Sequence, residues 1–211
     1  MAAPVFRTAS TITGSTSPVN LTAPASIANG DLLVACESGD LAASESMTYG
    51  LSGFTPLLSY TRSSASAAGT DLQLWYKIAS GEGASYDFTI DHGNLTAVGM
   101  VRIDGHDGAD PFDVSSILGY DDGTEALIQS INQTVVDCLV LGFTSWDASK
   151  TITTLPGGWA EAYHADVSGH DQDCIYKTQA AAGATGVAQY NLSSAAPYTS
   201  AVVVVQPPQA A

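Results

Sequence analysis

The stretch Gly30-Asp-Leu-Leu-Val-Ala35 shows the pattern that decides the fold, a Gly-Asp turn signal followed at once by a short apolar run. The stretch Val136-Asp-Cys-Leu-Val-Leu141 resembles it, at an offset of about 106 residues. Short apolar runs bounded by Gly, Asp, Asn and Pro are typical of buried β-strands. No long window of the chain places apolar residues at helical spacing. The sequence therefore predicts an all-β fold.

Similar runs recur along the whole chain and predict about eleven strands. A single open sheet of that size would leave long unpaired edges and an uncovered apolar face. We therefore expect an antiparallel, jelly-roll-like β-sandwich. The expected strands are Pro4–Thr13, Asp31–Glu37, Phe54–Thr61, Asp71–Ala79, Tyr86–Asp91, Thr96–Asp104, Val135–Ser145, Trp159–Asp166, Asp173–Thr178, Gly186–Leu192 and Thr199–Gln206.

The two stretches belong to two weakly similar halves, about residues 30–104 and 136–206. Neither half could cover its own apolar face alone, so we expect the halves to interleave around one core. Residues 1–211 would then form a single β-sandwich domain. Further segments match in the same order: Gly53–Tyr60 with Gly158–Tyr163, Asp71–Lys77 with Asp171–Lys177, Tyr86–Ile90 with Val187–Leu192, and Ala97–Ile103 with Ser200–Val205.

The charge balance limits the classes of partner. The chain of 211 residues has 21 acidic and 6 basic residues, a net charge of −15. Such a chain repels a phosphate backbone, so we expect no nucleic-acid partner. No apolar run approaches the ~20 residues of a membrane helix, and Met1-Ala-Ala-Pro4 lacks the basic start of a signal peptide. We expect synthesis in a cytoplasm and no membrane partner.

The three cysteines, Cys36, Cys138 and Cys174, are an odd number without Cys-x-x-Cys spacing. Each lies inside an apolar, strand-like run. We predict buried free thiols.

The densest polar segment contains Asp104, Asp107, Asp110 and Asp113 and is followed by Asp121-Asp122. These carboxylates are candidate metal ligands, because Ca²⁺ takes six to eight oxygens in irregular geometry. Their spacing matches no EF-hand loop. Asp and Gly are also the residues that a long crossover between two halves uses for its turns. We favour the turn role and expect no cofactor, with Ca²⁺ as the alternative.

Catalytic signatures do not stand out. The histidines His92, His106, His164 and His170 include no pair at i, i+2 or i, i+4, and we expect the last two to lie exposed around a turn. The chain has no Gly-x-Ser-x-Gly motif. Spacing along the chain does not exclude a catalytic site whose residues converge only in three dimensions. We predict a protein that is not an enzyme and has no catalytic residues.

Exposed aromatic rings would be needed for a sugar-binding face, because rings stack on pyranose C–H groups. Trp75 and Trp159 lie in or at the start of apolar strands, so we expect them in the core. Trp146 lies in the polar stretch Thr144–Lys150, and Tyr120 stands beside two aspartates. Trp146 and Tyr120 are the candidate ligand-facing aromatics.

Several motifs together resemble a jelly-roll domain found in structural proteins of tailed bacteriophages and in some bacterial surface proteins. The resemblance spans most of the chain, but its motifs mark turns and strands and are not catalytic signatures. It implies a jelly-roll fold and a capsid decoration or cement protein, a tail or fibre part, or a glycan-binding module. The motifs are Asn29-Gly-Asp-Leu-Leu-Val34, Trp75-Tyr-Lys-Ile-Ala79, Tyr86-Asp-Phe-Thr-Ile90, Gly99–Gly105, Ala109-Asp-Pro-Phe-Asp113, Asp137-Cys-Leu-Val140 and Pro156-Gly-Gly-Trp159.

Our hypothesis is a virion structural protein that decorates the outer capsid surface of a tailed phage. The acidic charge suits the outside of a DNA-filled shell better than its inside. The expected partners are the major capsid protein or other virion proteins, with a homo-oligomer such as a trimer. We expect the contacts at Met1–Thr16 and Val202–Ala211. The alternative is a carbohydrate-binding or host-receptor-binding tail module that uses Trp146, Tyr120 and the Asp-rich loop.

Overall fold

The computed structural model describes residues 2–14, 17–41, 49–60, 69–90, 95–147, 150–167 and 169–209. Side chains are described for these residues except 41, 69, 90, 117–122 and 147. All of the strand pairs are antiparallel. Over the described ranges no helix is long and apolar enough to cross a membrane. The prediction of an all-β sandwich is confirmed.

The first eight strands form a large and a small sheet that face each other. Eight strands in two such sheets are the arrangement of a jelly roll. The large sheet has the order β1 (Val5–Gly14), β8 (Thr96–Asp104), β3 (Leu32–Leu41), β6 (Gly69–Ile78) and β5 (Thr55–Tyr60), and the small sheet has the order β2 (Val19–Thr22), β7 (Ser85–Ile90) and β4 (Tyr49–Leu51).

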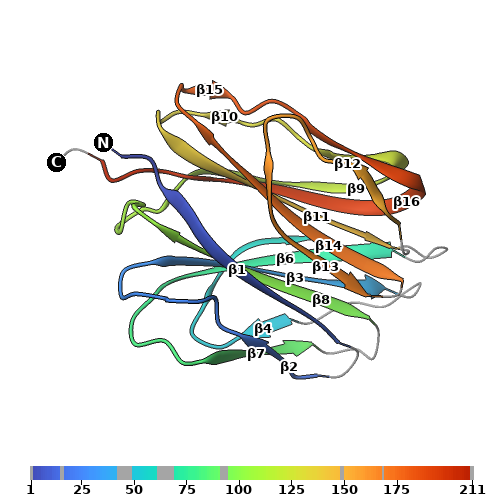
Figure 1. Cartoon of the computed structure of the whole chain (residues 1–211), viewed down its shortest axis with the longest axis horizontal. Helices are drawn as coiled ribbons and strands as arrows, with labels where there is room; N and C mark the ends of the chain where they lie inside the picture. The colour runs from blue at the N-terminus through green and yellow to red at the C-terminus, as the bar shows by residue number, and fades with distance from the viewer. Residues whose placement is uncertain are drawn as a thin grey trace.

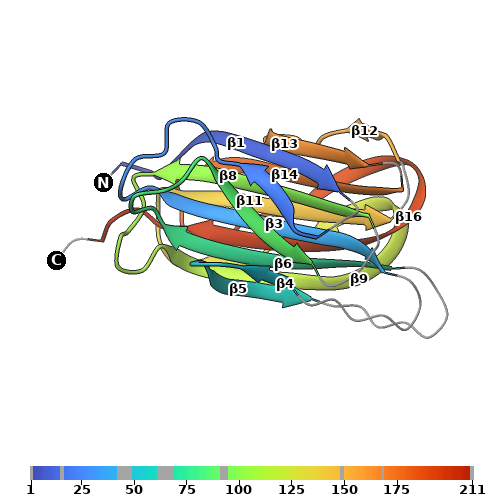
Figure 2. The same ribbon diagram turned by 90° about the horizontal axis from the view of Figure 1, so that it is seen from below.

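The second half repeats this strand order. Its two long strands, β9 (Phe112–Ile128) and β16 (Ala188–Val205), take the places of β1 with β2 and of β7 with β8. The ladder between β9 and β16 breaks between Asn191 and Ala196, where Figure 2 shows β16 curving round the end of the sandwich. The order β9, β16, β11, β14, β13 matches β1, β8, β3, β6, β5. The other strands are β11 (Cys138–Asp147), β14 (His170–Gln179), β13 (Ala160–Val167), β12 (Ile152–Thr154) paired with β16, and the short pair β10 (Asn132–Gln133) and β15 (Gly183–Ala184).

The strand registers show that the two halves are copies of one design. A bulge lies between Pro56 and Leu58 in β5, and a bulge lies between Glu161 and Tyr163 at the same place in β13. The repeat therefore runs from β1 to β8 and from β9 to β16, which is wider than the sequence match indicated.

The matching of individual positions follows from the ladders. Ser38 of β3 pairs with Leu72 of β6, and Ser145 of β11 pairs with Gln172 of β14. Ser38 therefore corresponds to Ser145. The offset of about 106 in the sequence alignment would have matched Ser38 with Thr144, one residue earlier.

The topology corrects the expected interleaving of the halves. Each half forms its own large sheet, and the two large sheets pack face to face without exchanging strands (Figures 1 and 2). The reason lies in the short strands β2, β4 and β12, which cover the outer faces locally. Each half needs the other only for its inner face.

Over the described residues, the apolar interior consists of three clusters in place of the single expected core. The shared cluster between the two large sheets joins the halves, because its residues come from both. The other two clusters lie between each large sheet and its own outer layer, as the stacked layers of Figure 1 show. Representative members are Val34, Leu74, Leu141 and Val203 in the shared cluster, Leu21, Trp75 and Phe88 in the first outer cluster, and Val140, Trp146 and Tyr190 in the second.

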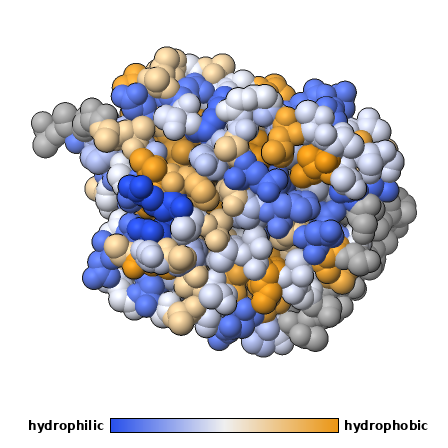
Figure 3. Space-filling view, viewed as in Figure 1, coloured by the Kyte–Doolittle hydropathy of each residue, from blue (hydrophilic) through white to orange (hydrophobic). Residues whose placement is uncertain are grey.

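The surface carries no strongly apolar face in the view of Figure 3, where hydrophobic and hydrophilic side chains are interspersed. Among the side chains that the structure describes, the exposed large hydrophobic ones are isolated in the sequence: Val5, Val136, Leu155 and Val187. Scattered exposed residues of this kind are ordinary on a protein surface.

Candidate functional site

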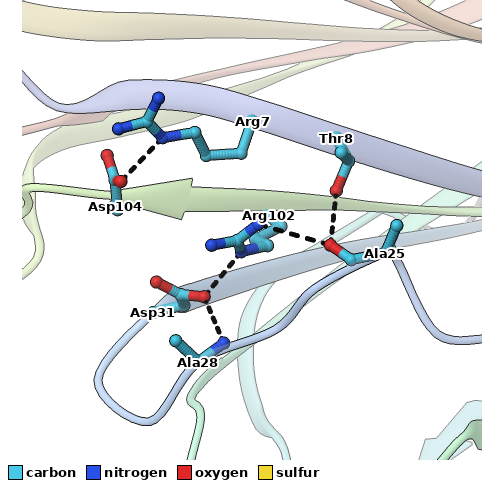
Figure 4. A network of polar contacts seen from close by, with 7 residues as sticks. All are labelled: Arg7, Thr8, Ala25, Ala28, Asp31, Arg102 and Asp104. Atoms are coloured by element: carbon cyan, nitrogen blue, oxygen red, sulfur yellow. Dashed lines mark hydrogen bonds and ion pairs between the residues drawn. The ribbon is translucent and has the colours of Figure 1, made fainter.

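Three of the four aspartates of the predicted metal loop, Asp104, Asp107 and Asp113, accept contacts from protein donors. Arg7 Nε lies 2.6 Å from Asp104 Oδ2 (Figure 4). Asp107 Oδ1 accepts the backbone N–H groups of Ala109 at 2.8 Å and Asp110 at 3.1 Å, which closes a turn. The same figure shows a second ion pair in this region, between Arg102 and Asp31.

Asp113 is likewise held in place, by the backbone N–H and the hydroxyl of Thr134 at 2.6 and 2.5 Å. Among the described residues, the structure does not bring the carboxylates of Asp104, Asp107, Asp110 and Asp113 together as a metal cluster. The side chains of Asp121 and Asp122 lie outside the described part. The Asp107 contacts close a turn, whereas Asp104 ends β8 and Asp113 lies in β9.

The exposure expected for Trp146 is wrong. The side chain is 0% exposed, because β11 continues to Asp147 where a polar loop was expected. The indole packs beside Tyr190, with ring centroids 6.2 Å apart, and its Nε1–H donates to Asp171 Oδ2 at 2.9 Å. Trp146 therefore cannot stack on a sugar in this conformation. Tyr120 lies in β9, and its side chain is outside the described part.

The predictions for Trp75 and the three cysteines are confirmed, and the prediction for Trp159 is confirmed in part. Trp75 is buried in the first outer cluster, as expected. Trp159 is only partly buried and lies beneath the ammonium of Lys177, 4.6 Å from the ring centroid. The three cysteines are buried free thiols, which confirms that prediction.

One predicted contact segment also needs correction. Val202–Val205 lie in the middle of the large sheet and are at most 2% exposed, so they are core residues and not a surface for partners. Met1, Ser15, Thr16, Ala210 and Ala211 lie outside the described residues. What remains of the predicted contact surface is β1 and the tail that follows β16.

The histidines lie in different environments. His92 lies outside the described residues, and His106 is buried near Asp107. His170 was expected to be exposed but is fully buried, because β14 begins there and turns its ring toward the other sheet. Of the three histidines that the structure describes, His164 borders a cleft.

His170 belongs to a polar belt that crosses the interface between the large sheets. Its Nε2 lies 3.0 Å from Ser38 Oγ and 3.2 Å from Ser145 Oγ. Gln172 Nε2 donates to Ser38 Oγ at 2.8 Å, and Tyr163 donates to Gln172 Oε1 at 2.8 Å. A serine beside a histidine suggests a nucleophile, but these side chains are buried between two sheets. Their contacts serve to join the halves.

A polar cleft of about 330 Å³ lies at the β13–β14 hairpin. The hairpin pairs Asp166 with Asp171 and His164 with Asp173, so alternate residues of both strands share its outer face. Figure 1 and Figure 2 place the tip of this hairpin at the end of the sandwich opposite the chain termini. The lining residues are Lys150, Thr151, Ile152, Glu161, His164, Asp166 and Asp171.

Three potential ligand atoms converge at this cleft. One side-chain atom each from His164, Asp166 and Asp171 lies within 4.8 Å of the other two. Asp171 is 1% exposed, and its Oδ2 accepts the indole N–H of Trp146 and the backbone N–H of Lys150 at 3.3 Å. The other oxygen, Asp171 Oδ1, is buried and has no hydrogen-bond partner.

The electrostatics of the cleft reflect burial and close acids. Burial raises the pKa of Asp171 to about 6, and the neighbouring carboxyl of Asp166 adds to the rise. The pKa of His164 is also raised, mainly by Asp173, whose Oδ1 lies 3.6 Å from His164 Nδ1. The cleft therefore favours a bound proton or cation.

The first half contains a counterpart of Asp171. Asp71 corresponds to Asp171, and its Oδ1 accepts the backbone N–H of Gly39 at 2.9 Å. The hydroxyl of Tyr49 provides a further hydrogen bond to Asp71. In the second half the position of Tyr49 is taken by Ile152, because Tyr49 pairs with Ile90 and Ile152 pairs with Leu192. Isoleucine has no hydroxyl to offer.

The sequence did not predict this cleft because only spacings between pairs of histidines were tested, and not those between a histidine and an aspartate. The useful signal is the alternation in His164-Ala-Asp166 and Asp171-Gln-Asp173 on either side of a turn that contains Gly169. In a hairpin, such alternation places all four polar side chains on one face.

None of the three comparisons, with protein-family models, with curated proteins and with solved structures, finds a match to this chain. The chemistry of the cleft is therefore argued from its residues alone. A half-exposed imidazole and two close carboxylates can share a proton, hold a cation or bind the hydroxyl groups of a polar ligand.

Proposed function

We propose that this protein is a non-enzymatic structural protein of a tailed-phage virion that decorates the outer surface of the capsid. The motifs that resemble phage jelly-roll proteins support the proposal, and two jelly-roll copies in one body are compatible with it. The net charge of −15 suits the outside of a shell filled with nucleic acid.

The observation that carries the proposal is the grouping of both chain ends beside an edge strand. The N-terminal and C-terminal segments leave the sandwich at the same end (Figures 1 and 2). The tail after β16 is tied down there, because Gln206 Nε2 donates to Asp110 O at 2.6 Å and Gln209 N donates to Asp107 Oδ2 at 3.0 Å. This end offers a held backbone to a neighbouring subunit.

Strand β1 adds a surface of the kind that assembly proteins use. It is the end strand of its sheet and pairs only with β8 among the described strands. An edge strand can accept a strand from a partner through backbone hydrogen bonds. Decoration would work by many modest contacts of this kind, which add up over the subunits of a shell.

The first test asks whether the protein is part of a particle. An antibody against the recombinant full chain is applied to virus particles purified from the source of the sequence, with electron microscopy as the readout. We expect regular labelling of the capsid surface. Particles without label, or with label confined to the tail, would overturn the decoration role.

The second test asks whether β1 makes the contact. Thr11 is an exposed residue of β1, and Thr55 is an exposed residue of β5 at the opposite edge of the same sheet. Lysine on an edge strand opposes strand addition. We expect Thr11→Lys to weaken binding to capsids stripped of the protein, and Thr55→Lys to bind as the wild type does. Equal binding of both variants would contradict a β1 interface.

The cleft supports a second candidate, a tail module that binds a carbohydrate or host receptor. The loss of Trp146 as an exposed ring removes the expected stacking platform, but Glu161 and Lys150 are polar groups that could bind sugar hydroxyls. A glycan-array signal that disappears in Glu161→Gln would favour this candidate. An array without signal would leave it unsupported.

A further inference from the structure

We propose that the cleft at the β13–β14 hairpin is a binding site for a divalent transition-metal ion, with His164, Asp166 and Asp171 as its protein ligands and Zn²⁺ as the best fit. The geometry of these residues carries the proposal, which is independent of the proposed role on the capsid.

The ligand set suits this class of ion. Zn²⁺ binds imidazole nitrogen and carboxylate oxygen at about 2.0–2.2 Å, and Zn²⁺ sites with three protein ligands keep one position open. Ligand atoms around such an ion lie within about 4 Å of one another. The three atoms here lie within 4.8 Å, and two of them belong to exposed side chains that can move closer. Imidazole makes Ca²⁺ the poorer fit, because Ca²⁺ prefers oxygen ligands.

The buried oxygen of Asp171 is the independent observation that points to a ligand. Asp171 Oδ1 has no hydrogen-bond partner although the residue is 1% exposed. Leaving a buried carboxylate oxygen unpaired is costly, so such groups in proteins are usually paired or bound to a metal. The carboxyl group lines the cleft, where an ion would reach it.

The contacts around the ligands also match those of metal sites. A metal-bound histidine almost always gives its other ring N–H to a carboxylate or carbonyl. Asp173, fully buried, lies 3.6 Å from Nδ1 of His164, an ion-pair contact that is longer than a hydrogen bond and that leaves Nε2 for the ion. Trp146 fixes the second carboxylate by donating to Asp171 Oδ2. Its indole also stacks near His164, with ring centroids 6.0 Å apart.

The comparison with the first half explains why the site belongs to one half only. Tyr49 donates a hydrogen bond to Asp71 in the first half, although Asp71 Oδ2 stays unpartnered, whereas Ile152 has no hydroxyl to donate to Asp171 in the second. Gln73 takes the position of Asp173, so the first half also lacks the carboxylate that orients the histidine. The second half carries all of the groups that the ion needs.

The test uses the full chain without a histidine tag, treated with a chelator and dialysed. Titration calorimetry and thermal unfolding are recorded with ZnCl₂, MnCl₂ and CaCl₂. We expect one Zn²⁺ per chain and a melting temperature that rises with Zn²⁺ concentration, because the ion binds the folded state. A response to Ca²⁺ that exceeds those to Zn²⁺ and Mn²⁺ would overturn the assignment of the ion.

Two variants at exposed ligands keep the test separate from folding, because their wild-type side chains are not part of the core. His164→Gln and Asp166→Asn should each weaken Zn²⁺ binding about tenfold or more, a loss at least as large as outer-shell changes cause. Asp110→Asn is the matched control, since Asp110 is an exposed aspartate outside the cleft. Zn²⁺ binding that is unchanged in both ligand variants would overturn the proposal. The proposal would also be overturned if the wild-type protein bound no metal and the cleft only took up a proton.

Discussion

Replacing Glu37 by glutamine should stabilise the protein at neutral pH. Glu37 lies on β3 between the first large sheet and its outer layer, where it is 0% exposed. Its carboxyl oxygens have no hydrogen-bond partner other than the side chain of Trp75. Burial raises the pKa of Glu37 to about 9 from its ordinary value of 4.5, Trp75 opposes the rise, and the charge of Asp71 adds to it.

The magnitude follows from linkage between protonation and folding. The folded state keeps the Glu37 proton up to about pH 9, whereas the unfolded state loses it near pH 4.5. The stability that this proton contributes is fully present below pH 4.5 and is lost as the pH rises through 9, at about 1.4 kcal/mol per pH unit. At pH 7 the free energy of unfolding of the wild type is therefore about 3 kcal/mol lower than it is below pH 4.5. Glutamine has no proton to lose.

The assay is urea unfolding of the wild type and Glu37→Gln at pH 4.5, 7 and 8.5. We expect similar stabilities at pH 4.5, an advantage of about 3 kcal/mol for the variant at pH 7, and a larger one at pH 8.5. Glu125→Gln, a change at an exposed glutamate, controls for loss of charge alone. A difference between Glu37→Gln and the wild type that stays constant with pH would refute the reasoning.

Three further predictions concern packing and burial. Gly99→Ala should destabilise the protein by about 1–3 kcal/mol in urea unfolding, because its Cβ would lie 2.1 Å from the Tyr163 ring, and adding Tyr163→Leu should recover part of the loss. Trp146→Phe removes a donor from the buried Asp171 and should cost about 1–3 kcal/mol by the same assay. Thiol reagents should label none of the cysteines in the native protein and all of them in urea: Cys36, Cys138 and Cys174.

The elements that sequence analysis predicted correctly are those whose apolar pattern is local. The strand at Thr96–Asp104 appears with the expected bounds, because its run of apolar residues lies between polar turns. The segment Phe112–Ile128 was expected to be a crossover, since it is rich in Asp, Gly and Ser, and it forms β9. Its pairing is supplied by β16, so tertiary contacts override its weak strand propensity.

The arrangement of the halves and the cleft were beyond sequence reasoning for a similar reason. Whether two copies interleave or stack depends on short strands such as β4 and β12, which are too short to show a periodic pattern. The burial of Trp146 depends on how far β11 extends past Ser145. The cleft depends on the register of one hairpin, and a slip of one residue would move its polar side chains to the other face.

The duplicated fold explains how one acidic position came to have two environments. Asp71 and Asp171 each receive one N–H at 2.9 Å, from the backbone of Gly39 in the first half and from the indole of Trp146 in the second. Each carboxylate keeps one buried oxygen without a partner, Asp71 Oδ2 and Asp171 Oδ1. Tyr49 donates a further hydrogen bond to Asp71 in one half, while in the other Ile152 lines a cleft. The first environment is a structural contact. The second leaves a buried carboxylate oxygen beside the cleft to be satisfied from solvent, which is the condition that a binding site requires.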